Sequence, residues 1–205
     1  AMSGGFGTTS SANVGAYNLT DTSQGTLILA NGPSGANQGL ASNYTLTGGT
    51  QDYTITQRVL SSSGSKAYDA NTNALAADIT LSNLVSGETL NHSGTASISS
   101  ANAASYTITN LAGITLADNA GLASNYTLTG GTHNFTVNPK VISLSGSRLY
   151  DATTDAVASD LTTISGLVGS ETLNLSGTGS VTNANVASNK TVTLGTLALA
   201  DNSGL

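Results

Sequence analysis

The chain has 205 residues, of which 38% are hydrophobic and only 8% are charged, and its net charge is −6. This acidic balance argues against nucleic-acid binding, because phosphate contacts need clustered Lys and Arg and the whole chain has 5 basic residues. The lack of cysteine excludes a disulfide framework and thiolate metal sites, and no run is long and apolar enough to predict membrane insertion.

The sequence repeats itself over long distances. The string GLASNYTLTGGT at residues 39–50 recurs without change at residues 121–132, an offset of 82 residues. One inserted residue near Thr163 shifts the offset to 83, so that Glu88 matches Glu171. A period of this length is too long for one coil of a solenoid and predicts a small domain repeated in tandem.

A recurring junction sets the boundaries of the repeats. Pro139-Lys140 and Gln57-Arg58 occupy equivalent positions, and each follows a short strand-like run. The junctions predict a partial repeat at residues 1–57, a complete repeat at residues 58–139 and a truncated repeat at residues 140–205. Because Ala1-Met2 resembles a cloning remnant, we expect the chain to be a fragment of a longer protein whose targeting signals lie elsewhere.

Most of each repeat is predicted to form short β-strands. In these runs β-branched and aromatic residues alternate with polar ones, and Gly and Asn separate the runs as turns. In chain order, the clearest candidates are residues 125–129, 134–137, 141–145, 171–175, 191–194 and 196–199.

The remaining signals concern turns and the fold class. Two glycines at 130–131 predict a hairpin between the first two strand candidates, and residues 73–78 and 155–160 favour a helical turn. About six strands per repeat predict an all-β fold. We expect tandem, small β-sandwich-like modules of about 82 residues in an elongated array, with a β-grasp-like module as the alternative.

A Tyr-Asp pair occurs once in each of the last two repeats, as Tyr68-Asp69 and Tyr150-Asp151. An aromatic face beside a carboxylate suits sugar binding, and this is the functional hypothesis for the four residues. In the structural hypothesis, the aspartate accepts hydrogen bonds from turn amides while the tyrosine packs over the edge of the core. The occurrence of one pair per repeat favours the structural hypothesis.

No constellation of residues predicts catalysis, a cofactor or a metal centre. His92 and His133 are not at equivalent positions, and neither has a cysteine or histidine at ligand spacing, which argues against zinc. Carboxylates recur at equivalent positions and would suit calcium between repeats, but no acidic loop of the calcium-binding type is present. The favoured alternative is pairing of Lys66 or Arg148 with a nearby aspartate.

Several strings together resemble a known repeat. Residues 140–152 read KVISLSGSRLYDA, while SGETL at residues 86–90 corresponds to GSETL at residues 169–173. This pattern resembles the YDG-type repeat and the related mostly-beta glycine-rich repeats of filamentous-haemagglutinin-like bacterial adhesins. Alanine stands at positions 70 and 152, where the family motif has glycine, which argues against a positive φ there.

The resemblance implies a structural and adhesive repeat of a large secreted protein at the bacterial cell surface, acting as a stalk in cell attachment or biofilm formation. The implied partners are neighbouring repeats and a surface glycan or exopolysaccharide. The alternative function is a carbohydrate-binding module of an extracellular protein. Because residues 140–205 lack a counterpart of residues 123–137, we also expect the end of one molecule to associate with the beginning of another by strand addition.

Overall fold

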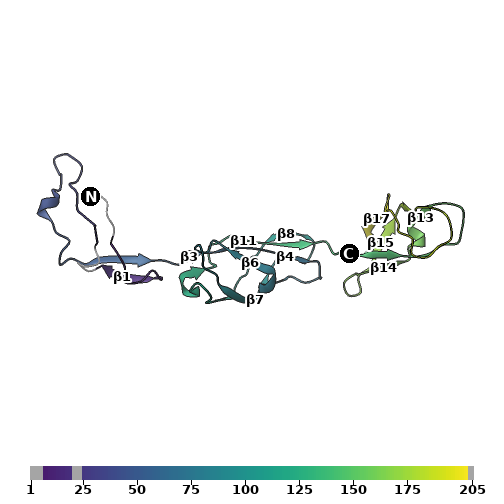
Figure 1. Cartoon of the computed structure of the whole chain (residues 1–205), viewed down its shortest axis with the longest axis horizontal. Coiled ribbons are helices and arrows are strands. Elements are labelled where there is room, and N and C mark those ends of the chain that lie inside the picture. The colour runs from purple at the N-terminus through teal and green to yellow at the C-terminus, as the bar shows by residue number, and fades with distance from the viewer. Residues whose placement is uncertain (1–6, 20–24, 203–205) are drawn as a thin grey trace. The chain divides into compact units, whose positions relative to one another are not determined.

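The computed structural model describes residues 7–19 and 25–202. Every regular element in this part is a β-strand or a 3-10 turn of three residues (Figure 1). The predicted all-β class is therefore confirmed. Among the described residues, no helix is long and apolar enough to cross a membrane. Residues 1–6 and 20–24 of the first predicted repeat, and residues 203–205 of the last, lie outside the described part.

The chain divides into two compact units. The first consists of residues 1–64, 73–97 and 107–135, and the second of residues 65–72, 98–106 and 136–205. This division cuts across the middle predicted repeat, because strands in that repeat have residues in both units. The repeat boundaries therefore stay a prediction, and each unit is described by itself.

The first unit begins with an antiparallel pair of strands. β1 (Gly15–Leu19) lies against β2 (Gln51–Ile55), with Leu19 opposite Gln51. The 3-10 turn η1 (Ala41–Asn43) precedes β2. The pair covers little apolar surface, since the side chain of Tyr53 in β2 is 54% exposed.

Two sheets follow, and both contribute to the core of the first unit. The larger sheet has the spatial order β6 (Ile79–Ser82), β4 (Ser61–Ala67), β11 (His133–Asn138) and β8 (Ala104–Thr107). The smaller sheet has the order β5 (Asn73–Leu75), β7 (Asn91–Ser97) and β9 (Ile114–Ala117). The turn η2 (Ala76–Asp78) joins β5 to β6.

An apolar cluster in the first unit packs against residues of both sheets. Leu60, Leu90 and Tyr126 are buried together, and they are packed against Leu81 of β6 and Leu116 of β9. Because one contributor comes from each sheet, the arrangement is that of a small β-sandwich. The buried area of such side chains is the main favourable term in the stability of the unit.

Strand β11 is the most deeply buried element of the larger sheet. Its inward side chains His133, Phe135 and Val137 alternate with more exposed ones, as expected for a strand with one face on the core. Phe135 is fully buried. A Cβ atom on Gly64 would lie 2.9 Å from the ring of Phe135, so glycine on β4 leaves the space that the ring occupies.

The parallel pairing of β3 and β10 corrects a prediction. β3 (Arg58–Val59) pairs in parallel with β10 (Tyr126–Thr127), which follows the turn η3 (Ala123–Asn125). The predicted hairpin at residues 130–131 would have joined β10 to β11 and is wrong. The turn itself is present, with a φ of 85° at Gly130. Tyr126 of β10 and Phe135 of β11 are buried in different strand pairs. Their burial outweighs the local sequence signal for a hairpin between the two strands.

The second unit contains three antiparallel pairs of short strands. They are β12 (Ser143–Ser145) with β14 (Thr163–Ser165), β13 (Asp155–Val157) with β16 (Thr178–Ser180), and β15 (Leu173–Ser176) with β17 (Ala198–Asp201). The turn η4 (Ala158–Asp160) follows β13. The helical turns expected at residues 73–78 and 155–160 are thus confirmed as single 3-10 turns that end strands β5 and β13. No named strand covers the candidate at 191–194, where Thr193 forms only an isolated bridge with Ser180.

The strand pairs of the second unit repeat those of the middle of the chain. Ser143 lies opposite Ser165 as Ser61 lies opposite Ser82. The bridge between Ser180 and Thr193 has its counterpart in the bridge between Ser97 and Asn110. The sequence repeat is therefore a repeat of backbone pairing as well.

Candidate functional site

The first Tyr-Asp pair forms a tight turn directly after β4. The Asp69 carboxylate accepts hydrogen bonds from the Asn71 backbone N–H at 3.1 Å and from the Asn71 side-chain amide at 2.8 Å. Lys66 at the end of β4 places its Nζ 2.8 Å from Asp69 Oδ1 and donates to the Asn71 carbonyl oxygen at 2.8 Å. The carboxylate is therefore committed to the turn, as the structural hypothesis predicts.

The second pair forms the same turn in the next repeat. The Asp151 carboxylate accepts hydrogen bonds of 2.9 Å from both the backbone N–H and the hydroxyl of Thr153. Arg148 forms an ion pair with Asp151 and donates to the Thr153 carbonyl oxygen at 2.6 Å. Arginine and lysine thus occupy one role at equivalent positions, as expected for the basic residues that recur between the repeats.

The backbone at these turns departs from the expectation. Ala70 has a φ of 61° and Ala152 a φ of 64°. Alanine therefore adopts the left-handed conformation at the two positions where the YDG-type motif has glycine. The prediction against a positive φ is wrong. This conformation costs an alanine roughly 1–2 kcal/mol, and the hydrogen bonds of the preceding aspartate hold the turn in place despite it.

The environments of the two aspartates favour their charged forms. Hydrogen bonds from Thr153, first from its backbone N–H, and the neighbouring Arg148 lower the pKa of Asp151 to about 2. For Asp69, burial acts to raise the pKa, but hydrogen bonds from Lys66 and Asn71 outweigh it and the net pKa is lowered. Both carboxylates therefore stay ionised well below neutral pH.

We expect Asp151→Asn to remove part of the acid sensitivity of the chain. The pKa of Asp151 in the folded chain lies below the ordinary value of 3.8, so its carboxylate stabilises the fold above that pH. This contribution is lost as the pH falls towards about 2. The melting temperature of the native chain should therefore drop more steeply over this interval than that of the variant. Asp155→Asn is the control, and equal slopes for native chain and Asp151→Asn would contradict the role of the turn.

The tyrosines of the two pairs differ in their surroundings. The Tyr68 hydroxyl donates to the Glu171 carboxylate, and this hydrogen bond is the main cause that raises the pKa of Tyr68. Tyr150, its counterpart, is 65% exposed. Tyr68 thus contacts a glutamate of the following repeat, whereas Tyr150 projects towards solvent.

A second tyrosine–glutamate pair lies within the first unit. The Tyr126 hydroxyl donates to the Glu88 carboxylate and accepts a hydrogen bond of 3.1 Å from the Val85 backbone N–H. This anchors the loop that contains the SGETL string on the core, where Tyr126 is 3% exposed. The sequence did not predict these partners, although the equivalence of Glu88 and Glu171 marked the glutamates as recurring.

Both histidines have structural partners. His133 is 4% exposed, with Nδ1 2.9 Å from the Ser62 hydroxyl and Nε2 2.8 Å from the Leu128 carbonyl oxygen. His92 Nε2 lies 3.0 Å from the carbonyl oxygens of Ala76 and Ile79. Over residues 7–19 and 25–202, no group of three or more His, Cys, Asp or Glu side chains is placed to hold a metal ion.

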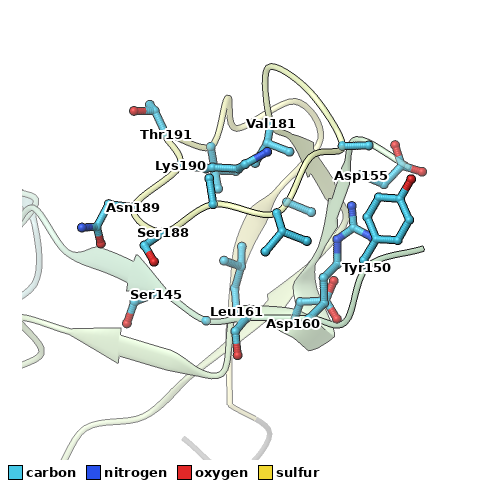
Figure 2. Close-up of a pocket in the computed structure, with 18 of the residues that line it drawn as sticks. Ser145, Tyr150, Asp155, Asp160, Leu161, Val181, Ser188, Asn189, Lys190 and Thr191 are labelled. Carbon is cyan, nitrogen blue, oxygen red and sulfur yellow. The ribbon is translucent and has the colours of Figure 1, made fainter. Parts of the chain in front are cut away.

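A cavity of about 620 Å³ lies in the second unit beside the second Tyr-Asp pair. Figure 2 shows Tyr150 and Asp155 at one end of it, with Leu161 and Lys190 on facing sides. An adjoining cavity of about 610 Å³ has an apolar lining that includes Leu144, Leu175 and Leu197. Of the predicted site residues, Tyr150 thus borders the cavity and Tyr68 contacts Glu171. Asp69 and Asp151 each lie within their own turn.

Comparison with known proteins gives one family. The sequence model of the YDG domain matches the chain twice, at residues 52–136 and at residues 133–204, and together the matches span well over half of the chain. No match was found among curated proteins or among solved structures. The two adjacent matches agree with the recurring strand pairs described above. The chain therefore belongs to the YDG domain family.

Proposed function

We propose that the chain is a structural and adhesive repeat region of a large, secreted bacterial surface protein, in which the repeats form a stalk for cell attachment or biofilm formation. The observation that carries this proposal is that two YDG domains follow each other directly, with matches that meet at residues 133–136. A spacer built from repeats has this organisation, in which similar domains with the same strand pairs follow each other directly.

The chemistry of the Tyr-Asp turns supports a structural role. Asp69 and Asp151 use their carboxylates within their own turns, where backbone and side-chain donors occupy them. Tyr68 makes its hydrogen bond to another part of the same chain. The resemblance to filamentous-haemagglutinin-like adhesins supports the placement at a bacterial surface, with neighbouring repeats and a surface glycan or exopolysaccharide as partners.

One observation favours the alternative function of a carbohydrate-binding module. Tyr150 is 65% exposed at the end of a cavity that Asp155 and Lys190 also border (Figure 2). An exposed aromatic ring next to polar side chains is a suitable surface for a sugar ring. The equivalent tyrosine of the preceding repeat, Tyr68, already donates its hydroxyl hydrogen bond to Glu171. For this reason the stalk is the preferred proposal.

A replacement experiment in the parent protein separates the two functions. We expect cells whose YDG repeats are replaced by an equal length of an unrelated tandem β-sandwich to attach as native cells do, because a stalk needs length and not a particular sequence. Cells with Tyr150→Ala in otherwise native repeats serve as the matched variant and should also attach normally. Loss of attachment in both strains, with export unchanged, would favour carbohydrate binding over the stalk.

A further inference from the structure

We propose that consecutive repeats are linked by a polar joint, in which a tyrosine and an asparagine of one repeat bind a glutamate and an asparagine of the next. The tyrosine and glutamate contact is that of Tyr68 with Glu171, and the asparagine contact is that of Asn13 with Asn125. The proposal rests on hydrogen bonds between repeats, so it holds for a stalk and for a carbohydrate-binding array alike. Its tests need no attachment of cells, and they can fail while the proposed function stands.

Between the middle and the last repeat, the joint is a hydrogen bond to a carboxylate. The Tyr68 hydroxyl donates to Glu171 Oε1. The tyrosine is positioned by its own repeat, because its backbone N–H donates to the Asn138 carbonyl oxygen at 2.8 Å and Asp69 closes the turn that follows. The glutamate is positioned by its own loop, where its backbone N–H donates to the Val168 carbonyl oxygen at 3.1 Å. Two side chains that are held in different repeats therefore meet in one hydrogen bond.

Between the first and the middle repeat, the joint is made by an asparagine side chain. Asn125 Oδ1 accepts a hydrogen bond of 2.8 Å from the Val14 backbone N–H. The amide group of Asn125 donates to Asn13 Oδ1 at 2.9 Å. One side chain thus uses both its acceptor and its donor on the same loop of the preceding repeat, which fixes the orientation of the contact.

The residue that connects two repeats is restrained at both places. Gln57 Nε2 donates to the carbonyl oxygens of Ser124 and Tyr126, both at 3.1 Å. Its counterpart Pro139 has no side-chain amide, but the proline ring holds the backbone φ at about −65°. A flexible link would let the contacting side chains separate, so restraint at this position supports a joint of fixed geometry.

The two contacts belong to one joint, because the loop that contains Asn13 recurs in the middle repeat. The Tyr17 hydroxyl donates to the Asn13 carbonyl oxygen at 2.7 Å, and the Tyr106 hydroxyl donates to the Asn102 carbonyl oxygen at 2.6 Å. Asn102 is therefore the counterpart of Asn13. The middle repeat thus has both residues, Tyr68 and Asn102, that bind a following repeat.

The glutamate and the asparagine on the other side of the joint also lie together. Glu88, the counterpart of Glu171, accepts a hydrogen bond from Tyr126, which directly follows Asn125 in the chain. The two tyrosines do not exclude each other, since Tyr126 donates to Oε2 of its glutamate and Tyr68 donates to Oε1. An ionised carboxylate accepts hydrogen bonds at both oxygens. One glutamate can therefore bind a tyrosine of its own repeat and a tyrosine of the preceding repeat.

The compact units divide the chain as such a joint requires. Residues 65–72 and 98–106 of the middle repeat, which carry its joint tyrosine and asparagine, belong to the unit of the last repeat. The two segments are themselves connected, since the Ile98 N–H donates to the Thr72 carbonyl oxygen at 3.0 Å. In the same way, the loop of Asn13 belongs to the unit that contains most of the middle repeat. The residues that bind a following repeat thus group with that repeat.

A change of background tests the contact between tyrosine and glutamate. We expect Tyr68→Phe to lower the melting temperature by about 4–8 °C, the shift that the loss of one hydrogen bond produces in a domain of this size. In a chain that already has Glu171→Ala, the same change should have little effect, because the acceptor is absent. Tyr150→Phe is the matched control and should leave the melting temperature unchanged, since Tyr150 is 65% exposed. An equal loss in both backgrounds, or no loss in either, would overturn the contact.

Spin labels measure whether this contact fixes one repeat against the next. The chain has no cysteine, so Thr80→Cys on β6 and Thr163→Cys on β14 place one label on the middle and one on the last repeat, both at exposed positions. We expect a narrow distribution of distances between the labels in the native background and with Tyr150→Phe. With Tyr68→Phe the distribution should be several-fold broader. A native distribution as broad as that of Tyr68→Phe would contradict the joint.

A second pair of labels reports on the asparagine contact. Ala16→Cys on β1 and Thr80→Cys on β6 label the first and the middle repeat at exposed positions. We expect Asn125→Ala to broaden the distribution of distances between these labels. Asn43→Ala is the matched control, because it removes asparagine from the identical string at residues 39–50, and it should leave the distribution narrow. Broadening with both variants, or with neither, would show that Asn125 does not hold the repeats together.

Discussion

Replacing Phe135 with alanine is expected to lower the free energy of unfolding of the middle repeat by about 3–5 kcal/mol, as is usual for a large aromatic side chain removed from a packed core. The ring is fully buried in β11 and fills the space that Gly64 leaves on β4. This loss is a large part of the roughly 5–15 kcal/mol by which a domain is stable. Thermal or urea unfolding measures it.

The chain carries its own control for this prediction. Tyr53→Ala changes the counterpart of Phe135 in β2, where the ring is 54% exposed, and it should have a much smaller effect. If both variants lose the same free energy, the difference in burial between the two repeats is not the determinant of stability.

The sequence was sufficient to predict the fold class, because the all-β signals are local. Alternating residues such as those of β11 specify strands, and glycine and asparagine specify the turns between them. The Asp69 and Asp151 turns were also predictable, since an aspartate two residues before a backbone donor is a local motif.

Features that depend on distant residues were not predictable in the same way. The pairing of β10 with β3 brings Tyr126 next to Arg58, and this long-range pairing overrides the local hairpin signal at residues 130–131. The Tyr68 contact with Glu171 likewise joins residues of different repeats. The left-handed conformation of Ala70 is the opposite case, in which the turn geometry prevails over the local preference of alanine.

The last prediction concerns a chain extended after Leu205 by a copy of residues 123–139. We expect the extended chain to have a higher melting temperature than the native chain. The added segment contains the counterparts of Phe135 and Val137, and burial of such side chains contributes about 1.5–3 kcal/mol each. Ordering the added strand opposes this gain, so the rise in melting temperature measures the difference between the two terms.

The matched control is an extension in which the counterparts of Phe135 and Val137 are serine. It has the same length and the same backbone donors and acceptors, but it lacks the side chains that fill the cavity beside β12. It should leave the melting temperature close to that of the native chain. The two extensions give distinguishable outcomes. If both raise the melting temperature, any added chain stabilises the fold. If neither raises it, β12 does not accept a strand in the position that β11 has beside β4. Only a change confined to the apolar extension supports a site beside β12 that the side chains of the added strand fill.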